Sequence, residues 1–144
     1  MLQNFKHMPL ILKFLTAHGL MCLMLLVFSV IPNDSMSIDG KEVTYAQWWS
    51  SGAGVFASAV GLALPFSAWL ILQKSTLARP VYLSSLVLTL VLPYLIFWEN
   101  YGSAIAGAVL VMLVAGYLYR KQSVVEYFGS NPSFKRDRRE AAAP

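Results

Sequence analysis

His18 and Cys22 are the two side chains in the apolar part of this chain whose types and spacing could do chemistry. They lie four residues apart, so a helix would place them on one face. An ionisable side chain inside a membrane span is a candidate functional residue by default. Three interpretations are open: a neutral histidine hydrogen-bonded to a serine or threonine, a histidine that binds a proton or ligand, and a metal ligand.

Few other residues could complete such a site. The only other histidine, His7, precedes the apolar run, and the single cysteine excludes an internal disulfide and a multi-thiolate site. Structural zinc takes four ligands, so we expect no metal and no cofactor. Ser67 and Thr89 would lie at a depth similar to that of His18. The sequence contains no zinc-protease, nucleophile-elbow or phosphate-loop motif, so we expect no catalytic residue and no enzyme.

Four long apolar runs must position these residues. Hydrophobic residues make up 57% of the 144 and charged residues only 12%, unlike a soluble domain. Each run is close to the ~20 residues that a helix needs to cross a bilayer. We therefore expect an all-α integral membrane fold, an up-down bundle of four transmembrane helices over about 10–31, 46–73, 80–98 and 102–121.

The runs leave room for one domain, 1–129, followed by a polar and basic segment, 130–144, which we expect to be a disordered cytoplasmic tail. Pro65 and Pro93 fall inside predicted helices, and Pro65 is expected to kink its helix. Val124, Val125 and Phe128 give the segment 123–129 an apolar face, so it is predicted to form a short amphipathic helix on the membrane.

The loop between the first two helices contains its own structural signals. Asp39-Gly40 supplies the positive φ values of a tight turn, and apolar residues flank it, so a small β-hairpin is predicted over 36–44. Thr44 and Gln47 match a capping box at the start of the second helix. Trp48 and Trp49 follow, as in the aromatic belt of a membrane interface.

Lysine and arginine predict the orientation. If the chain crosses a membrane four times, ten of the eleven fall on one side and only Lys41 on the other. The positive-inside rule then places both termini in the cytoplasm. Because the basic residues flank apolar runs, the net charge of +4 indicates topology and contact with anionic lipid, and we expect no nucleic-acid binding.

The outer side is where a partner protein is expected to bind. It carries the acidic hairpin loop above a pair of tryptophans, and one further acidic residue between the last two helices. The predicted partner-binding residues are Asp34, Asp39, Glu42, Trp48, Trp49 and Glu99.

Small residues recur every four positions in the second and fourth helices. Such residues allow spanning helices to approach closely. The rows include Gly54, Ser58 and Gly61 in the second helix, and Ala106 and Gly107 in the fourth. They predict a close approach of these two helices in the outer half. Two alternatives are a seam between two copies of the chain and the ordinary abundance of small residues in spanning helices.

The end of the fourth helix resembles a known group. The segment from Leu118 to Phe128, LYRKQSVVEYF, resembles the ending of small four-span bacterial inner-membrane proteins of unknown function, and Ala78–Leu83 is similar in character. The resemblance implies a bacterial inner membrane and no activity.

Together these patterns predict a non-enzymatic membrane protein that binds a partner in or at the inner membrane, as an accessory subunit or an immunity-type protein. The partner is another membrane or extracytoplasmic protein, or a second copy of the chain. The alternative is a small oligomeric transporter or channel that uses His18.

Overall fold

The computed structural model describes residues 2–33, 36–38, 40–96 and 101–129. It is mostly helical, with one two-stranded antiparallel hairpin. Four helical segments are long and apolar enough to cross a membrane: Leu10–Val30, Ala53–Leu72, Ala78–Ile96 and Tyr101–Arg120. The prediction of four helices of spanning length is therefore confirmed.

The first spanning segment is nearly continuous. After the short helix α1 (Leu2–Lys6), it consists of α2 (Leu10–Met21) and α3 (Leu23–Val30). At Cys22 the chain tightens, because the Leu25 amide donates to the Cys22 carbonyl three residues back, at 2.9 Å. Such i to i+3 bonds are typical of a local 3₁₀ turn.

The predicted hairpin and capping box are both present. Strands β1 (Ser37–Ile38) and β2 (Lys41–Glu42) pair in antiparallel fashion, and Gly40 has a φ of +76° in the turn. Thr44 and Gln47 cap each other at the start of α4 (Tyr45–Ser50). The second helix does not run unbroken from residue 46, however. Gly52, with a φ of +85°, ends α4, and α5 (Ala53–Leu72) starts after it.

The second half of the chain has one break that the sequence explains. Helix α6 (Ala78–Leu90) and helix α7 (Leu92–Ile96) are separated at Val91, two residues before Pro93. Proline lacks an amide hydrogen and its ring crowds the carbonyl four residues back, here that of Thr89. Helices α8 (Tyr101–Arg120) and α9 (Gln122–Gly129) complete the described chain, whereas α5 continues through Pro65.

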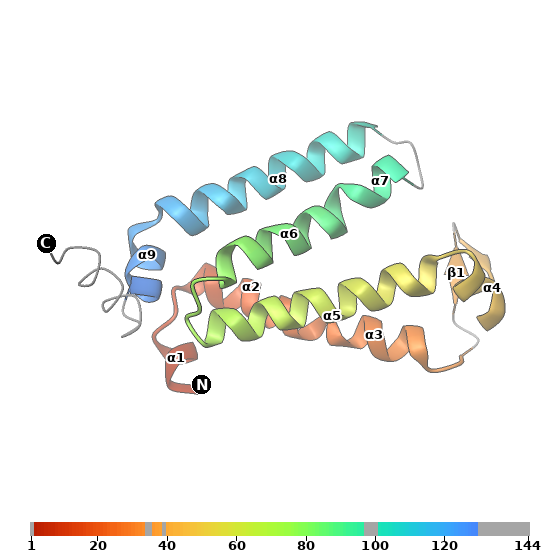
Figure 1. Cartoon of the computed structure of the whole chain (residues 1–144), viewed down its shortest axis with the longest axis horizontal. Coiled ribbons are helices and arrows are strands. Elements are labelled where there is room, and N and C mark those ends of the chain that lie inside the picture. The colour runs from red at the N-terminus through yellow and green to blue at the C-terminus, as the bar shows by residue number, and fades with distance from the viewer. Residues whose placement is uncertain (1, 34–35, 39, 97–100, 130–144) are drawn as a thin grey trace, which may run out of the picture.

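The spanning helices form a row in which each packs on its neighbours in sequence. Helix α5 contacts α2 and α3 on one side and α6 on the other, and α8 packs on α6 and α7. Figure 1 shows the resulting order, with α6 between α5 and α8. The hairpin and α4 lie at one end of the molecule, and α1 and α9 lie at the other (Figure 1). We call these the hairpin end and the α9 end.

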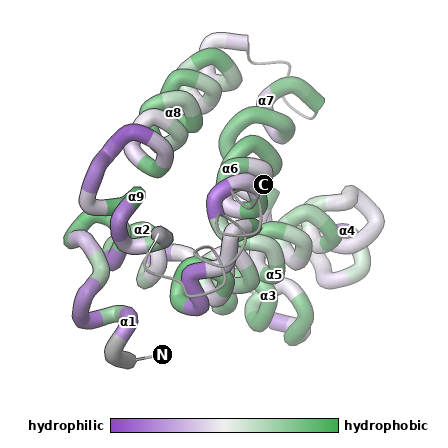
Figure 2. Tube along the Cα trace, turned by 60° about the vertical axis from the view of Figure 1, so that its left-hand side comes forward, coloured by the Kyte–Doolittle hydropathy of each residue, from purple (hydrophilic) through white to green (hydrophobic). Residues whose placement is uncertain are grey.

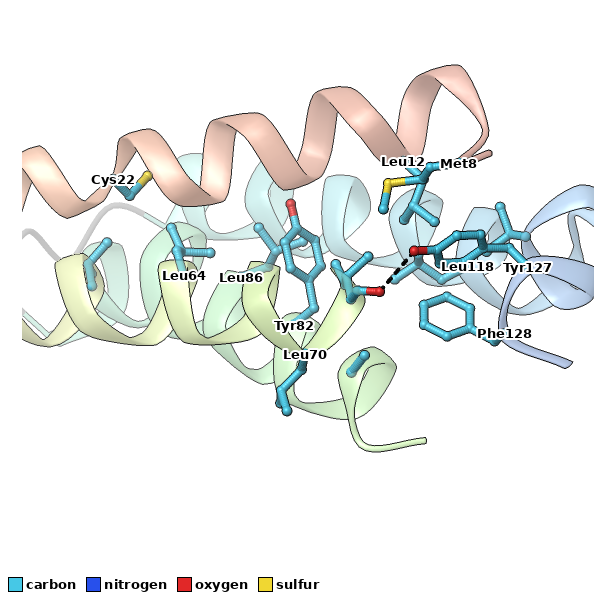
Figure 3. Packing of buried hydrophobic residues seen from close by; sticks show 14 residues of the cluster. Met8, Leu12, Cys22, Leu64, Leu70, Tyr82, Leu86, Leu118, Tyr127 and Phe128 are labelled. Atoms are coloured by element: carbon cyan, nitrogen blue, oxygen red, sulfur yellow. Dashed lines mark hydrogen bonds between the residues drawn. The ribbon is translucent and has the colours of Figure 1, made fainter. Parts of the chain in front are cut away.

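The largest group of buried side chains lies toward the α9 end. There Met8 and Leu12 of the first segment meet Leu118, Tyr127 and Phe128 of the last part of the chain (Figure 3). The Tyr127 hydroxyl donates to the Ile71 carbonyl at 3.2 Å. The predicted amphipathic helix is thus formed, but it buries Val124, Tyr127 and Phe128 against the bundle while Val125 is exposed.

Candidate partner-binding surface

The basic residues divide unequally between the two ends of the molecule. Toward the α9 end, they lie in α1, in the first turn of α2, in the turn after α5, at the start of α6 and around the end of α8: Lys6, Lys13, Lys74, Arg79, Arg120 and Lys121. At the hairpin end, the described basic residue is Lys41 in β2. This asymmetry is the one on which the orientation prediction depends.

Ser29 joins three elements at the hairpin end. Its buried hydroxyl donates to the Gly54 carbonyl of α5 at 3.0 Å. It accepts from the Trp48 indole nitrogen of α4 at 3.0 Å and from the Ser58 hydroxyl at 3.2 Å. A hydroxyl has one hydrogen to donate and two lone pairs, so all of its capacity is used. Ser29 therefore ties α4 and α5 to the first spanning segment.

Trp48 and Trp49, two of the predicted partner-binding residues, are half-buried, and their rings lie between α4 and α5. A side chain added at Gly54 would meet the rings of both Trp48 and Trp49 at 2.8–2.9 Å. The absence of a side chain at residue 54 is what lets the rings lie against α5. Tyr45 adds a further tie, because its hydroxyl donates to the Val30 carbonyl at 2.9 Å and its ring stands edge-on to Trp49.

A shallow pocket opens above this anchored helix. It has a volume of about 470 Å³ and lies between the hairpin and α4, lined by Ile38, Lys41, Val43, Gln47, Ser50 and Ser51. Its lining mixes apolar side chains with hydroxyl and amide groups and one lysine. No carboxylate of the described residues lines the pocket, so a polar protein segment could bind there without burying an unpaired acidic side chain of these residues.

Of the predicted acidic residues, only Glu42 falls in the described part of the chain. It is exposed on β2, where it pairs in register with Ser37. Asp34, Asp39 and Glu99 lie outside the described residues. A role for these four carboxylates in binding a partner therefore stays a prediction.

His18 points away from the helix row. Its side chain is exposed, whereas Cys22, on the same helix face, is buried. The imidazole Nε2 lies 4.0 Å from the Cys22 sulfur, and this is its hydrogen-bonding contact within the described chain. The expected bond from His18 to a serine or threonine is not formed among these residues. No three histidine, cysteine or acidic residues of the described part gather as a metal site would require.

The other two predicted intramembrane polar residues, Ser67 and Thr89, both have hydrogen-bond partners. The Ser67 hydroxyl lies 2.9 Å from that of Ser85, which joins α5 to α6, and also donates to the Ala63 carbonyl. Thr89 donates to the Ser85 carbonyl of its own helix at 2.8 Å. This arrangement stabilises the contact between α5 and α6 and provides no polar group for His18.

The prediction that the second and fourth helices pack together is wrong within one chain. Gly61 of α5 lies against the backbone of Leu26 in α3, and Gly107 of α8 lies against the Leu90 carbonyl of α6. Ala106 is exposed. The small residues do mark close approaches, but α5 and α8 use them toward different neighbours.

The comparisons with known proteins gave no relative: no protein-family model, curated protein or solved structure matches this chain.

Sequence reasoning missed Ser29, the residue that organises the hairpin end. The signal was present, since Ser29 is the one polar residue in the run Leu23–Val30. A single hydroxyl group in an apolar span needs a hydrogen-bond partner, and Trp48 is a donor near the same end of the predicted helices.

Proposed function

We propose that this chain is a multi-pass protein of a bacterial inner membrane with the α9 end in the cytoplasm. Four spanning-length helices support the proposal, as do their outward-facing side chains: Phe14 is 72% exposed, Met112 64% and Leu113 69%. Large apolar side chains exposed on several helices mark a surface that contacts lipid or another protein. The excess of lysine and arginine at the α9 end supports the orientation. The bacterial setting rests on the resemblance of the segment after α8.

Within that membrane, we infer that the protein is non-enzymatic and binds a partner protein at the hairpin end. One observation carries the inference: a hairpin and a short helix, the latter held to the bundle through Ser29, line an open pocket to which the four helices of spanning length contribute no residue. A surface held in this way is preorganised, which reduces the entropy lost on binding. The roles of accessory subunit and immunity-type protein both fit.

The orientation is tested by labelling single cysteines. In a Cys22→Ala background, Glu42→Cys and Ser123→Cys are compared in spheroplasts treated with a membrane-impermeant maleimide. We expect labelling of residue 42 in intact spheroplasts and labelling of residue 123 only after lysis. The reverse pattern, or a chain that stays soluble without detergent, contradicts the proposed location.

Binding is tested by photo-crosslinking in cells. A benzophenone amino acid at Glu42 or Gln47 lies beside the pocket, and the same probe at Ser123 is the matched control at the other end. We expect discrete adducts with one protein species from the first two positions and none of that species from the third. Glu42→Lys should weaken the adduct formed from position 47. Adducts of equal pattern from all three positions would refute the binding surface.

The alternative, a small transporter or channel that uses His18, predicts that His18→Ala abolishes proton-coupled flux. The binding proposal predicts that the adduct formed from residue 47 is unchanged in the same variant. His18 does not line the pocket at the hairpin end.

A further inference from the structure

A second pocket lies at the α9 end, where α1, α2, α8 and α9 meet. Its volume is about 690 Å³. Three basic residues, Lys6, His7 and Lys121, line one part of it, and Leu10, Ile11 and Tyr117 line another. Figure 2 shows the same division along the chain, with hydrophilic segments in α1 and between α8 and α9 beside hydrophobic helices.

The cations at this end divide into two sets by what they touch. The Lys74 amine lies 4.8 Å from the centre of the Tyr127 ring, and the Arg79 guanidinium lies 4.6 Å from that of Phe128. These cation–π contacts hold α9 on the bundle. Lys6 and Lys121 instead line the pocket. Both are exposed, and neither forms an ion pair with any residue that the structure describes.

One acidic residue lines the pocket alongside them. The Glu126 carboxylate accepts a hydrogen bond from the Gln122 amide at 2.9 Å, within α9. The two lysines and one glutamate leave the pocket with an excess of positive charge. A ligand of the complementary charge is an anion.

The position of the pocket relative to the ends of the spans indicates what kind of anion it can bind. Leu10 is the first residue of the first spanning segment and Tyr117 is in the last turn of the fourth, so the pocket lies across the ends of two spans. Leu10 is 81% exposed and Ile11 54%. Apolar side chains therefore lie on the span side of the pocket, and Lys6 and Lys121 lie just beyond both span ends. An anionic phospholipid has the same arrangement, with acyl chains inside the bilayer and a phosphate at its edge.

We propose that this pocket binds the headgroup of an anionic phospholipid of the cytoplasmic leaflet. The phosphate lies between Lys6 and Lys121, and an acyl chain follows Leu10 and Ile11. The inference rests on the membrane location proposed above, and not on the binding of a partner at the hairpin end. A lysine near an anionic surface contributes about fivefold in affinity, so the pair together contributes about thirtyfold.

The test is native mass spectrometry of the full chain released from detergent. Palmitoyl-oleoyl phosphatidylglycerol is titrated against phosphatidylcholine with the same acyl chains. Lys6→Gln with Lys121→Gln is compared with Lys41→Gln, which removes a lysine at the opposite end. We expect one tightly retained phosphatidylglycerol, a loss of about thirtyfold in affinity in the double variant, and no change in Lys41→Gln. Circular dichroism checks that each variant keeps its helix content.

Three results would overturn the proposal. The first is equal retention of the two lipids, and the second is an equal loss of affinity in the Lys41→Gln control. The third is binding of soluble glycerol phosphate as tight as that of phosphatidylglycerol, which would make the ligand a free phosphate compound. If lipid binding fails but photo-crosslinking from residue 42 still succeeds, only the lipid site is refuted and the proposed function is unaffected. If the chain is soluble without detergent, the proposed membrane location is itself refuted.

Discussion

Replacing Ser29 with alanine removes the residue that holds the hairpin end together. Three hydrogen bonds are lost at once: those to the Gly54 carbonyl, from the Trp48 indole and from the Ser58 hydroxyl. One hydrogen bond in a membrane protein contributes about 0.6 kcal/mol on average and about 1.7 kcal/mol at most. Three average bonds give about 2 kcal/mol, and the buried Trp48 N–H that loses its partner adds to the cost rather than reducing it.

The assay is unfolding of the purified protein in mixed micelles by increasing mole fraction of dodecyl sulfate, followed by circular dichroism. Hydrogen exchange of the α4 amides reports whether that helix is released locally. Thr89→Ala is the matched control, because Thr89 donates only to a carbonyl of its own helix. We expect Ser29→Ala to lose about 2 kcal/mol, with faster exchange in α4, and Thr89→Ala to lose under about 0.5 kcal/mol. Equal losses in both variants, with unchanged exchange in α4, would refute the role given to Ser29.

Three further predictions concern packing and the α9 end. Gly61→Ala places a methyl group 2.5 Å from the Leu26 amide nitrogen, so we expect a loss of about 1–3 kcal/mol in the same unfolding assay, whereas Gly116→Ala, with nothing within 4 Å, should not destabilise. Burial raises the pKa of Tyr127 from 10.0 to about 12, so the folded state keeps a proton that the unfolded chain releases above pH 10. The free energy of unfolding should therefore lose nothing from this group below pH 10 and should fall between pH 10 and 12. This fall should be smaller in Tyr127→Phe. Phe128→Ala removes a buried ring that lies under Arg79, and we expect the α9 amides to exchange faster while those of α5 do not, with uniform acceleration arguing against a locally docked α9.

The elements of this fold could be predicted from the sequence because each has a local cause. Apolar runs of spanning length predicted the four long helices, Asp39-Gly40 predicted the hairpin, and Thr44 with Gln47 predicted the start of α4. Gly52 could have indicated the break between α4 and α5, since a glycine after a short helix often ends it. The break at Cys22 has no comparable signal in the residue types around it.

The neighbours of each helix could not be predicted in the same way. In a soluble helix the apolar face identifies the core, but a membrane helix is apolar on the lipid side as well. The exposure of His18 and the burial of Cys22 beside it therefore leave no trace in the hydrophobic pattern. Small residues such as Gly61 and Gly107 indicate that something comes close, and do not say which helix it is.

The hairpin and the two tryptophans near it could be predicted from the sequence, but the contacts that hold them could not. Charge asymmetry pointed to the hairpin end as the outer surface, and Trp48 and Trp49 were expected near it. How the two rings are held depends on Gly54, five residues after Trp49, and on Ser29, which lies 19 residues before Trp48 in another helix. The pairing of Trp48 with Ser29 follows from the packing of two helices and not from spacing along the chain.

The sequential order of the helix row bears on how the protein is made. Since α5 packs on the segment before it, α6 on α5, and α8 on α6, each contact forms between a new helix and one already synthesised. In the membrane location proposed above, insertion and assembly can therefore proceed together on the ribosome, and the docking of α9 near Met8 and Leu12 is a late step that joins the end of the described chain to its start.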